Sequence, residues 1–189
     1  MRILVSALFL SCLTTNPVQA AEVRWVERQT TIAVCIAAAG PAHFLQVAEQ
    51  IASLIYAPIG IGIEWLYGRS CPAAAIEITL TFDRPDTFHP RSLGFANPND
   101  GRNIEVFANR LNVVSESRRI DLLGHVFAHE IGHILQGMAR HSATGLMKAQ
   151  WDEPDYRAME QHLLMFTVAD AGLIRDGVAR REALRNAGR

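Results

Sequence analysis

The chain has 189 residues, of which 49% are hydrophobic and 20% are charged, and its formal net charge is −1. This composition is ordinary for a globular protein, and the length suits one domain with a real core. The nearly neutral charge gives no electrostatic reason to expect a nucleic acid as a partner. We therefore expect a single domain over residues 21–189, preceded by a leader over residues 1–20.

Residues 1–20 have the pattern of a secretory signal peptide. Arg2 provides a minimal positive start, a largely apolar stretch follows, and a cleavage site of the small-residue type precedes Ala21. The apolar stretch is too short to span a bilayer comfortably, and no later segment has transmembrane character. A lipoprotein signal is disfavoured because Phe9 stands where leucine is usual before the cysteine, here Cys12. We expect a soluble mature protein that is secreted or periplasmic.

The mature chain alternates between strand-like and helix-like patterns. Strands are predicted at residues 23–35, 61–67, 76–82 and 104–108, with a short edge strand at 93–96 in a loop rich in Pro, Gly, Asn and Asp. Apolar residues spaced three and four apart predict a helix after Pro41, with Phe44, Ile51, Leu54 and Ile55 in its stripe, and a long helix near 117–136. A turn-rich segment, 141–147, precedes two further helical stretches, the second capped by Thr167. This order predicts an α+β fold, in which the long helix packs across a twisted mixed sheet before a small helical C-terminal part.

Three cysteines are present, and Cys12 leaves with the signal peptide if that peptide is cleaved. The two that remain, Cys35 and Cys71, favour a disulfide because an exported chain folds in an oxidising compartment. Two buried thiols are the alternative, and a thiol that touches a metal ion is a more distant one. A disulfide would stabilise the fold by about 4 kcal/mol in the chain-entropy model.

The segment 129–141 carries most of the chemical information. His129 and His133 stand four residues apart, so on a helix both imidazoles project from one face and can bind one metal ion. Glu130 lies between them, where its carboxylate can reach a metal-bound water and act as a base. These residues predict a hydrolytic site with one catalytic Zn²⁺.

A third metal ligand is expected after the helix ends. Gly137 offers a helix stop, and His141 follows where a returning chain can bring its imidazole to the metal. Glu153 and Glu160, on the following segment, are the alternatives to His141. His125 shares the helix face but lies about 12 Å along the axis from the second motif histidine, so we expect it in a cleft wall or in solvent.

At this point the chain resembles the metzincin zinc metalloproteases. The resemblance rests on His129-Glu130-x-x-His133, then a glycine, a third histidine and a methionine turn at Gly145-Leu146-Met147. The stretch 128–151 is more specifically similar to a group of small exported bacterial proteins regarded as zinc peptidases. The resemblance implies that Met147 forms a hydrophobic floor under the zinc and that the edge strand at 93–96 binds an extended peptide.

The chain departs from the metzincin pattern in two ways. Metzincins usually have glycine three residues after the second histidine and the third histidine three residues later. Here Gly137 and His141 follow at spacings of four and four, which makes the pattern HExxH-x7-H. No tyrosine directly follows Met147, and Tyr156 is the candidate to stabilise the transition state in its place.

The predicted function is zinc-dependent hydrolysis of a peptide bond in a peptide or protein substrate, with Glu130 activating the zinc-bound water. The alternative is an exported protein that binds zinc through the same histidines without proteolytic turnover. Glu130 favours the enzyme, because a purely structural zinc site has four protein ligands and needs no base.

Overall fold

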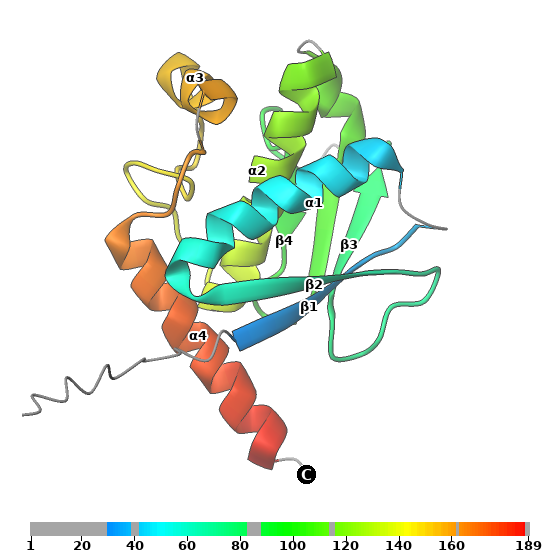
Figure 1. Cartoon of the computed structure of the whole chain (residues 1–189), viewed down its shortest axis with the longest axis vertical. Helices are drawn as coiled ribbons and strands as arrows, with labels where there is room; N and C mark the ends of the chain where they lie inside the picture. The colour runs from blue at the N-terminus through cyan, green and yellow to red at the C-terminus, as the bar shows by residue number, and fades with distance from the viewer. Residues whose placement is uncertain (1–29, 39–41, 83–87, 114–115, 162, 188–189) are drawn as a thin grey trace, which may run out of the picture.

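The computed structural model describes residues 30–38, 42–82, 88–113, 116–161 and 163–187. The predicted signal peptide and the first part of the predicted first strand lie outside these ranges. The strands are β1 (Thr30–Ile36), β2 (Ile61–Tyr67), β3 (Ile76–Thr81), β4 (Gly94–Ala96) and β5 (Asn103–Phe107). The α-helices are α1 (His43–Tyr56), α2 (Glu116–Gln136), α3 (Glu153–Gln161) and α4 (Val168–Ala187) (Figure 1). Across the described part of the chain, no helix combines the length and hydropathy that a membrane span needs.

The strands form one mixed sheet in the order β2-β1-β3-β5-β4. The first four strands in this order run parallel, and β4 runs antiparallel to β5 at one edge. The predicted edge strand is therefore present, and so is the predicted mixed sheet. β1 lies inside the sheet, where Val34 pairs with Trp65 on one side and with Ile76 on the other. This position explains why the apolar second half of β1 is buried.

α1 and α2 cover the same face of the sheet and pack against each other (Figure 1). Trp65 of β2 contacts both helices: its indole N–H donates to the Ser53 hydroxyl of α1 at 2.9 Å, and its ring lies 5.9 Å from the Phe127 ring of α2. The buried Tyr56 of α1 donates its hydroxyl to the Ala128 carbonyl of α2 at 2.9 Å. These contacts hold the long motif helix across the sheet, as the sequence predicted.

The buried stripe of α1 differs in part from the predicted one. Phe44 and Leu54 are 46% and 58% exposed, although both belong to the predicted stripe. The buried apolar residues of α1 are Leu45, Ala48, Ile51, Ala52, Ile55 and Tyr56. Small residues are needed on this side because α2 approaches closely: a Cβ on Gly124 would lie 2.8 Å from the Ala48 carbonyl oxygen. A spacing of three and four residues fits either stripe, so only the neighbouring helix selects between them.

α4 packs against the C-terminal end of α2. A Cβ on Gly177 would lie 1.6 Å from the Leu135 carbonyl oxygen, so a larger residue would push the two helices apart. α4 begins after Thr167, as predicted, and the Thr167 hydroxyl oxygen accepts a hydrogen bond from the Asp170 backbone N–H at 3.1 Å. The start of α4 therefore lies beside the chain that follows α2.

Cys35 of β1 and Cys71 form a disulfide, the pairing that the sequence favoured. Cys35 is buried in the sheet, and Cys71 lies in the connection between β2 and β3. The two cysteines are 36 residues apart, and the loop they close contains α1 and β2. The disulfide therefore ties the connection after the edge strand β2 to β1, which lies inside the sheet.

Replacing Cys35 and Cys71 together by alanine should lower the free energy of unfolding by about 4 kcal/mol, because the unfolded chain regains the conformational entropy of the open loop. Urea unfolding with and without a reductant measures this difference. The reductant should destabilise the wild type and leave the double-alanine variant unchanged. Equal unfolding midpoints for the wild type and the variant would contradict a stabilising role for the bridge.

Candidate metal centre

Three histidines meet at the C-terminal half of α2. His129 and His133 lie on one face of the helix, which ends where Gly137 adopts φ +71° and its N–H bonds the His133 carbonyl at 3.0 Å. The chain then turns back and brings His141 beside them. Among the described residues, these three form the one group of metal-binding side chains whose ligand atoms all lie within 4.8 Å of one another. His141, rather than Glu153 or Glu160, completes the group.

Backbone carbonyls orient the two helical imidazoles. The Leu146 carbonyl bonds Nδ1 of His129 at 2.8 Å, and the Met138 carbonyl bonds Nδ1 of His133 at 3.2 Å. A carbonyl oxygen can only accept a hydrogen bond, so each Nδ1 carries the proton and each Nε2 presents a lone pair. This is the tautomer in which Nε2 can bind a metal ion, with a backbone partner that fixes the ring.

The two lone pairs point at each other. Nε2 of His129 and Nε2 of His133 are 3.0 Å apart, while two nitrogens on a tetrahedral zinc ion at about 2.1 Å would be about 3.4 Å apart. Two facing lone pairs at this distance repel each other unless a proton or a cation lies near both. The donor set of three imidazoles is also one that zinc accepts. The residues present therefore fit a zinc ion.

The surroundings of all three histidines lower their pKa values and so favour the neutral imidazoles. Burial, with a smaller contribution from the neighbouring imidazoles, lowers the pKa of His129 to about 3. Burial and the neighbouring His141 lower the pKa of His133 to about 4, and burial lowers the pKa of His141 as well. A metal ion therefore does not have to displace protons from these rings near neutral pH.

Glu130 lies next to the three histidines, against the edge strand β4. Its side chain is 7% exposed, and burial raises its pKa to about 8, although the backbone N–H of Ala96 bonds its carboxylate and counteracts this shift. A Cβ on Gly94 would lie 2.9 Å from Oε1 of Glu130, so β4 can pass this close because glycine stands there. Glu130, the predicted base, is therefore hydrogen-bonded to β4, the edge strand that was expected to bind an extended peptide.

The three histidines and Glu130 open into a cleft of about 260 Å³. The cleft is lined by the edge strand with the residues before it, 91–96, and by the segment 148–151 with Tyr156 of α3. Tyr156 is half-buried there, and burial and the nearby acidic side chains raise the pKa of its phenol. An extended peptide can bind in such a cleft, because the backbone groups of a sheet edge can form hydrogen bonds with the peptide backbone.

The methionine turn packs beneath the metal-binding helix. Met147 is fully buried, and a Cβ on Gly132 would lie 2.8 Å from its Sδ, so the thioether packs directly against α2 between the two helical histidines. Leu146 precedes it, and its carbonyl accepts a second hydrogen bond from the Trp151 indole N–H at 3.1 Å. The Trp151 ring stands edge-on to His129, with ring centroids 5.5 Å apart. Met147 thus packs against α2 at Gly132, and its role as a floor under the metal stays a prediction of the metzincin resemblance.

The prediction for His125 is wrong. We expected it in a cleft wall or in solvent, but it is fully buried outside the cleft. Its Nδ1 bonds the Asp121 carbonyl at 2.7 Å, and its Nε2 accepts the Leu164 backbone N–H at 3.1 Å. His125 therefore ties α2 to the segment before α4, a partner that lies too far along the chain for helix spacing to reveal. Its exclusion as a metal ligand agrees with the group of three histidines.

The two alternative third ligands lie on α3. Glu160 forms a salt bridge with Arg118 of α2, and Glu153 begins α3. Sequence reasoning also missed one residue beside the centre, the buried Asp170 of α4, whose carboxylate accepts hydrogen bonds from Arg140 and Ser142. The local sequence marks Asp170 only as part of a helix start, three residues after the cap Thr167, because its partners Arg140 and Ser142 lie about 30 residues earlier.

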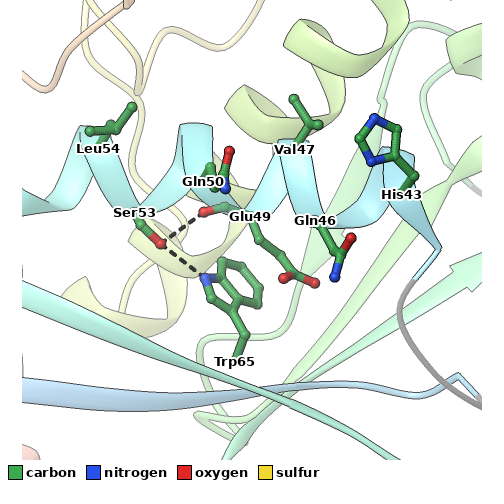
Figure 2. Close-up of a pocket in the computed structure, with 8 residues that line it drawn as sticks. All are labelled: His43, Gln46, Val47, Glu49, Gln50, Ser53, Leu54 and Trp65. Carbon is green, nitrogen blue, oxygen red and sulfur yellow. Dashed lines mark hydrogen bonds between the residues drawn. The ribbon is translucent and has the colours of Figure 1, made fainter.

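A second cavity, of about 640 Å³, lies between α1 and β2 and shares no residue with the cleft (Figure 2). Burial raises the pKa of its carboxyl group, Glu49, whose side chain accepts a hydrogen bond from the Tyr67 hydroxyl. The Ser53 hydroxyl bonds the Glu49 carbonyl at 2.8 Å and accepts the Trp65 N–H. Glu49, Ser53 and Trp65 therefore use their polar groups in these hydrogen bonds. The candidate catalytic residues are those of the cleft, the three histidines and Glu130.

The sequence matches no protein-family model, and no curated protein is similar to it in sequence. Solved structures are similar in fold. The archaemetzincin from Methanopyrus kandleri matches with a TM-score of 0.58 at 12% identity, over 80% of this chain and 97% of its own. The archaemetzincin from Archaeoglobus fulgidus, solved in complex with malonate, matches with a TM-score of 0.51 at 14% identity, over 76% of this chain and 99% of its own. This chain therefore has the archaemetzincin fold, and the metzincin-like architecture predicted from the sequence is confirmed.

Proposed function

We propose that this protein is a zinc metallopeptidase, in which His129, His133 and His141 bind zinc and Glu130 moves the proton during peptide-bond hydrolysis. The observation that carries the proposal is the pair of inward-facing Nε2 lone pairs, 3.0 Å apart, beside a buried carboxylate in an open cleft. The archaemetzincin fold supports the same reading.

The chemistry that a bound zinc ion supplies is polarisation of a substrate carbonyl and a lower pKa for water at the open position. Glu130 accepts the proton of the attacking water and delivers it to the leaving nitrogen. Burial raises the pKa of Glu130 to about 8 in the metal-free protein, and a bound cation would lower this pKa toward the ionised form that accepts a proton. The Ala96 N–H holds the carboxylate in place during both steps.

The outer edge of β4 supports an extended peptide as the substrate. The Phe107 N–H bonds the Leu93 carbonyl, and the Asn97 N–H bonds the Asn103 carbonyl, so the odd-numbered residues of this segment face β5. In an antiparallel pair the residues between them, Gly94 and Ala96, then direct their backbone groups away from β5. Since Ala96 already bonds Glu130, the Gly94 backbone is the group that an extended peptide would meet by strand addition.

The alternative function is zinc binding without turnover. A purely structural site would have four protein ligands, whereas the group among the described residues contains three. A structural zinc site also needs no base, because it has no bound water to activate, yet the carboxyl group of Glu130 lies in the cleft. Both observations favour the enzyme.

We also propose that the protein is exported, with residues 1–20 removed as a signal peptide. The Cys35–Cys71 disulfide supports this proposal, because such bonds persist in the oxidising compartments outside the cytosol.

The ligand set is tested by zinc content and affinity of the mature chain, residues 21–189. Replacing His141 by alanine removes one of three ligands, and we expect zinc affinity to fall by more than about 100-fold. His43→Ala is the matched control, since His43 is an exposed histidine on α1 outside the cluster. Zinc affinity that survives His141→Ala and falls with Glu153→Ala would assign the third ligand to α3 instead.

Catalysis is tested on a mixed peptide library with zinc-loaded wild type and Glu130→Ala. The variant should keep its zinc and lose cleavage, because the histidines remain and the base is gone. Products identified by mass spectrometry report the cleavage positions. A zinc-loaded wild type that cleaves no peptide would favour the zinc-binding alternative.

Glu130→Gln should change the pH dependence of stability in the metal-free protein. The folded wild type keeps a proton on Glu130 up to about pH 8, while the unfolded chain loses it near 4.5, so rising pH destabilises the fold across this interval. The glutamine variant should therefore gain stability relative to the wild type, by up to about 1.4 kcal/mol per pH unit. Urea unfolding in a chelator across this range measures the difference.

Adding zinc supplies the control for this prediction. A nearby cation favours the ionised carboxylate, so the pH-dependent gap between wild type and Glu130→Gln should shrink when zinc is present. A gap that stays constant with pH in the chelator would show that Glu130 is not held in its protonated form.

A further inference from the structure

We propose that Asp170 is a positioning residue that holds His141 in place as the third metal ligand. The inference rests on the proposed metal site and gives a further role to a residue that the sequence marks only as part of the start of α4. Asp170 lies 29 residues after His141, in the first turn of α4, and its side chain is fully buried. Its carboxylate joins α4 to the stretch of chain that carries the third histidine.

The two neighbours of His141 in the chain both bind this carboxylate. Arg140 donates through its guanidinium to Oδ1 of Asp170 at 2.9 Å, and the Ser142 hydroxyl donates to the same oxygen at 2.5 Å. His141 is therefore flanked on both sides by residues whose side chains end on one buried oxygen. This oxygen and a hydrogen bond from the Ser142 backbone N–H to the Met147 carbonyl, at 2.8 Å, together fix the backbone around His141.

The carboxylate is itself rigidly held. Oδ2 of Asp170 accepts a hydrogen bond from the Thr167 hydroxyl at 2.6 Å, and the Asp170 N–H returns one to the Thr167 oxygen at 3.1 Å. Burial alone would raise the pKa of Asp170, but the hydrogen bonds from Ser142, Thr167 and Arg140 outweigh it and lower the pKa. Asp170 is thus an anion with three donors, fixed at the start of a long helix.

His141 needs this support more than its two partners. His129 and His133 are buried on a helix, and each ring is oriented by a backbone carbonyl. His141 is exposed, and in the described part of the chain its ring has contacts with the other two imidazoles and no hydrogen bond. Since its own ring is not anchored, its place near the metal depends on the backbone, which the Asp170 contacts help to fix.

Asp170 also balances a charge beside the site. Arg140 is adjacent to a metal ligand, and its positive charge would repel a bound cation. Pairing with the buried carboxylate draws the guanidinium toward α4 and neutralises it. Both effects act in the same direction, toward tighter metal binding at His141.

The test compares zinc affinity in Asp170→Asn and wild-type mature chain by competition with a chelating indicator. The amide keeps the size of the carboxylate but loses its charge, and we expect affinity to fall by about 10–100-fold, the range seen when outer-shell partners are removed. Asp176→Asn is the matched control, an exposed acid on the same helix, and should leave affinity unchanged. Unchanged affinity in Asp170→Asn would overturn the inference.

A double-mutant cycle separates positioning from a general effect on the fold. If Asp170 acts mainly through His141, then Asp170→Asn should cause a much smaller loss of zinc affinity in the His141→Ala background, where only the unpaired charge of Arg140 still acts on the metal. An equal loss in both backgrounds would overturn the inference. If His141→Ala alone leaves affinity unchanged, the proposed ligand set fails and the inference fails with it, whereas a loss in His141→Ala with none in Asp170→Asn rejects the inference alone.

A second variant guards against misfolding at the start of α4. The pair Arg140→Met and Ser142→Ala leaves Asp170 bonded to Thr167, yet removes both contacts to the His141 segment. This variant should reproduce the loss of zinc affinity, and cobalt in place of zinc should show the altered visible spectrum of a site that has lost a ligand. A wild-type cobalt spectrum and affinity in this variant would overturn the proposal.

Discussion

The hydrogen bond between Nδ1 of His129 and the Leu146 carbonyl is the interaction on which the centre depends. It joins the metal-binding helix to a chain segment 17 residues later and fixes the ring in the tautomer that binds metal through Nε2. The same carbonyl accepts the Trp151 indole, which stands against His129, and the next residue is Met147, packed beneath the helix at Gly132. One carbonyl therefore orients the His129 ring and the Trp151 ring, and the residue after it packs against α2.

The Leu146 carbonyl is held by a chain of contacts that returns to α2. The Leu146 N–H bonds the Met165 carbonyl at 2.9 Å, and the neighbouring Leu164 N–H bonds the buried His125. The helix that carries His129 and His133 thus also anchors, through His125, the segment that bonds Leu146. His125, four residues before His129, has this structural role although its residue type suggests a ligand.

The centre concentrates polar groups that are costly to bury. Glu130 and two imidazoles lie beside one another at under a tenth exposure, and their pKa values are shifted toward the neutral forms. Such a cluster destabilises an empty fold, and a bound cation would offset part of that cost by pairing with the lone pairs and the carboxylate. The disulfide and the close packing of α1, α2 and α4 supply stability from outside the site.

Much of the architecture could be predicted because its signals are local. Alternation at β2 and β3 and the spacing in α2 survive in the structure within a residue or two of the expected bounds. The stripe of α1 could not be predicted fully, because the choice between Leu45 and Phe44 depends on how closely Gly124 lets α2 approach. The orientation of β4 likewise needed its partner strand, since an edge segment of three residues carries no direction in its pattern.

The sequence by itself determined the two helical histidines and the carboxylate between them, since a four-residue spacing on a helix places both rings on one face. It favoured the Cys35–Cys71 disulfide but left two buried thiols as the alternative. It proposed His141 but left Glu153 and Glu160 open. Only the tertiary structure decided that His141 joins the group and that Asp170 anchors the residues on either side of it. The physical reason is that this part of the centre is built from contacts about 30 residues apart, and no local spacing encodes which oxygen a returning chain will meet.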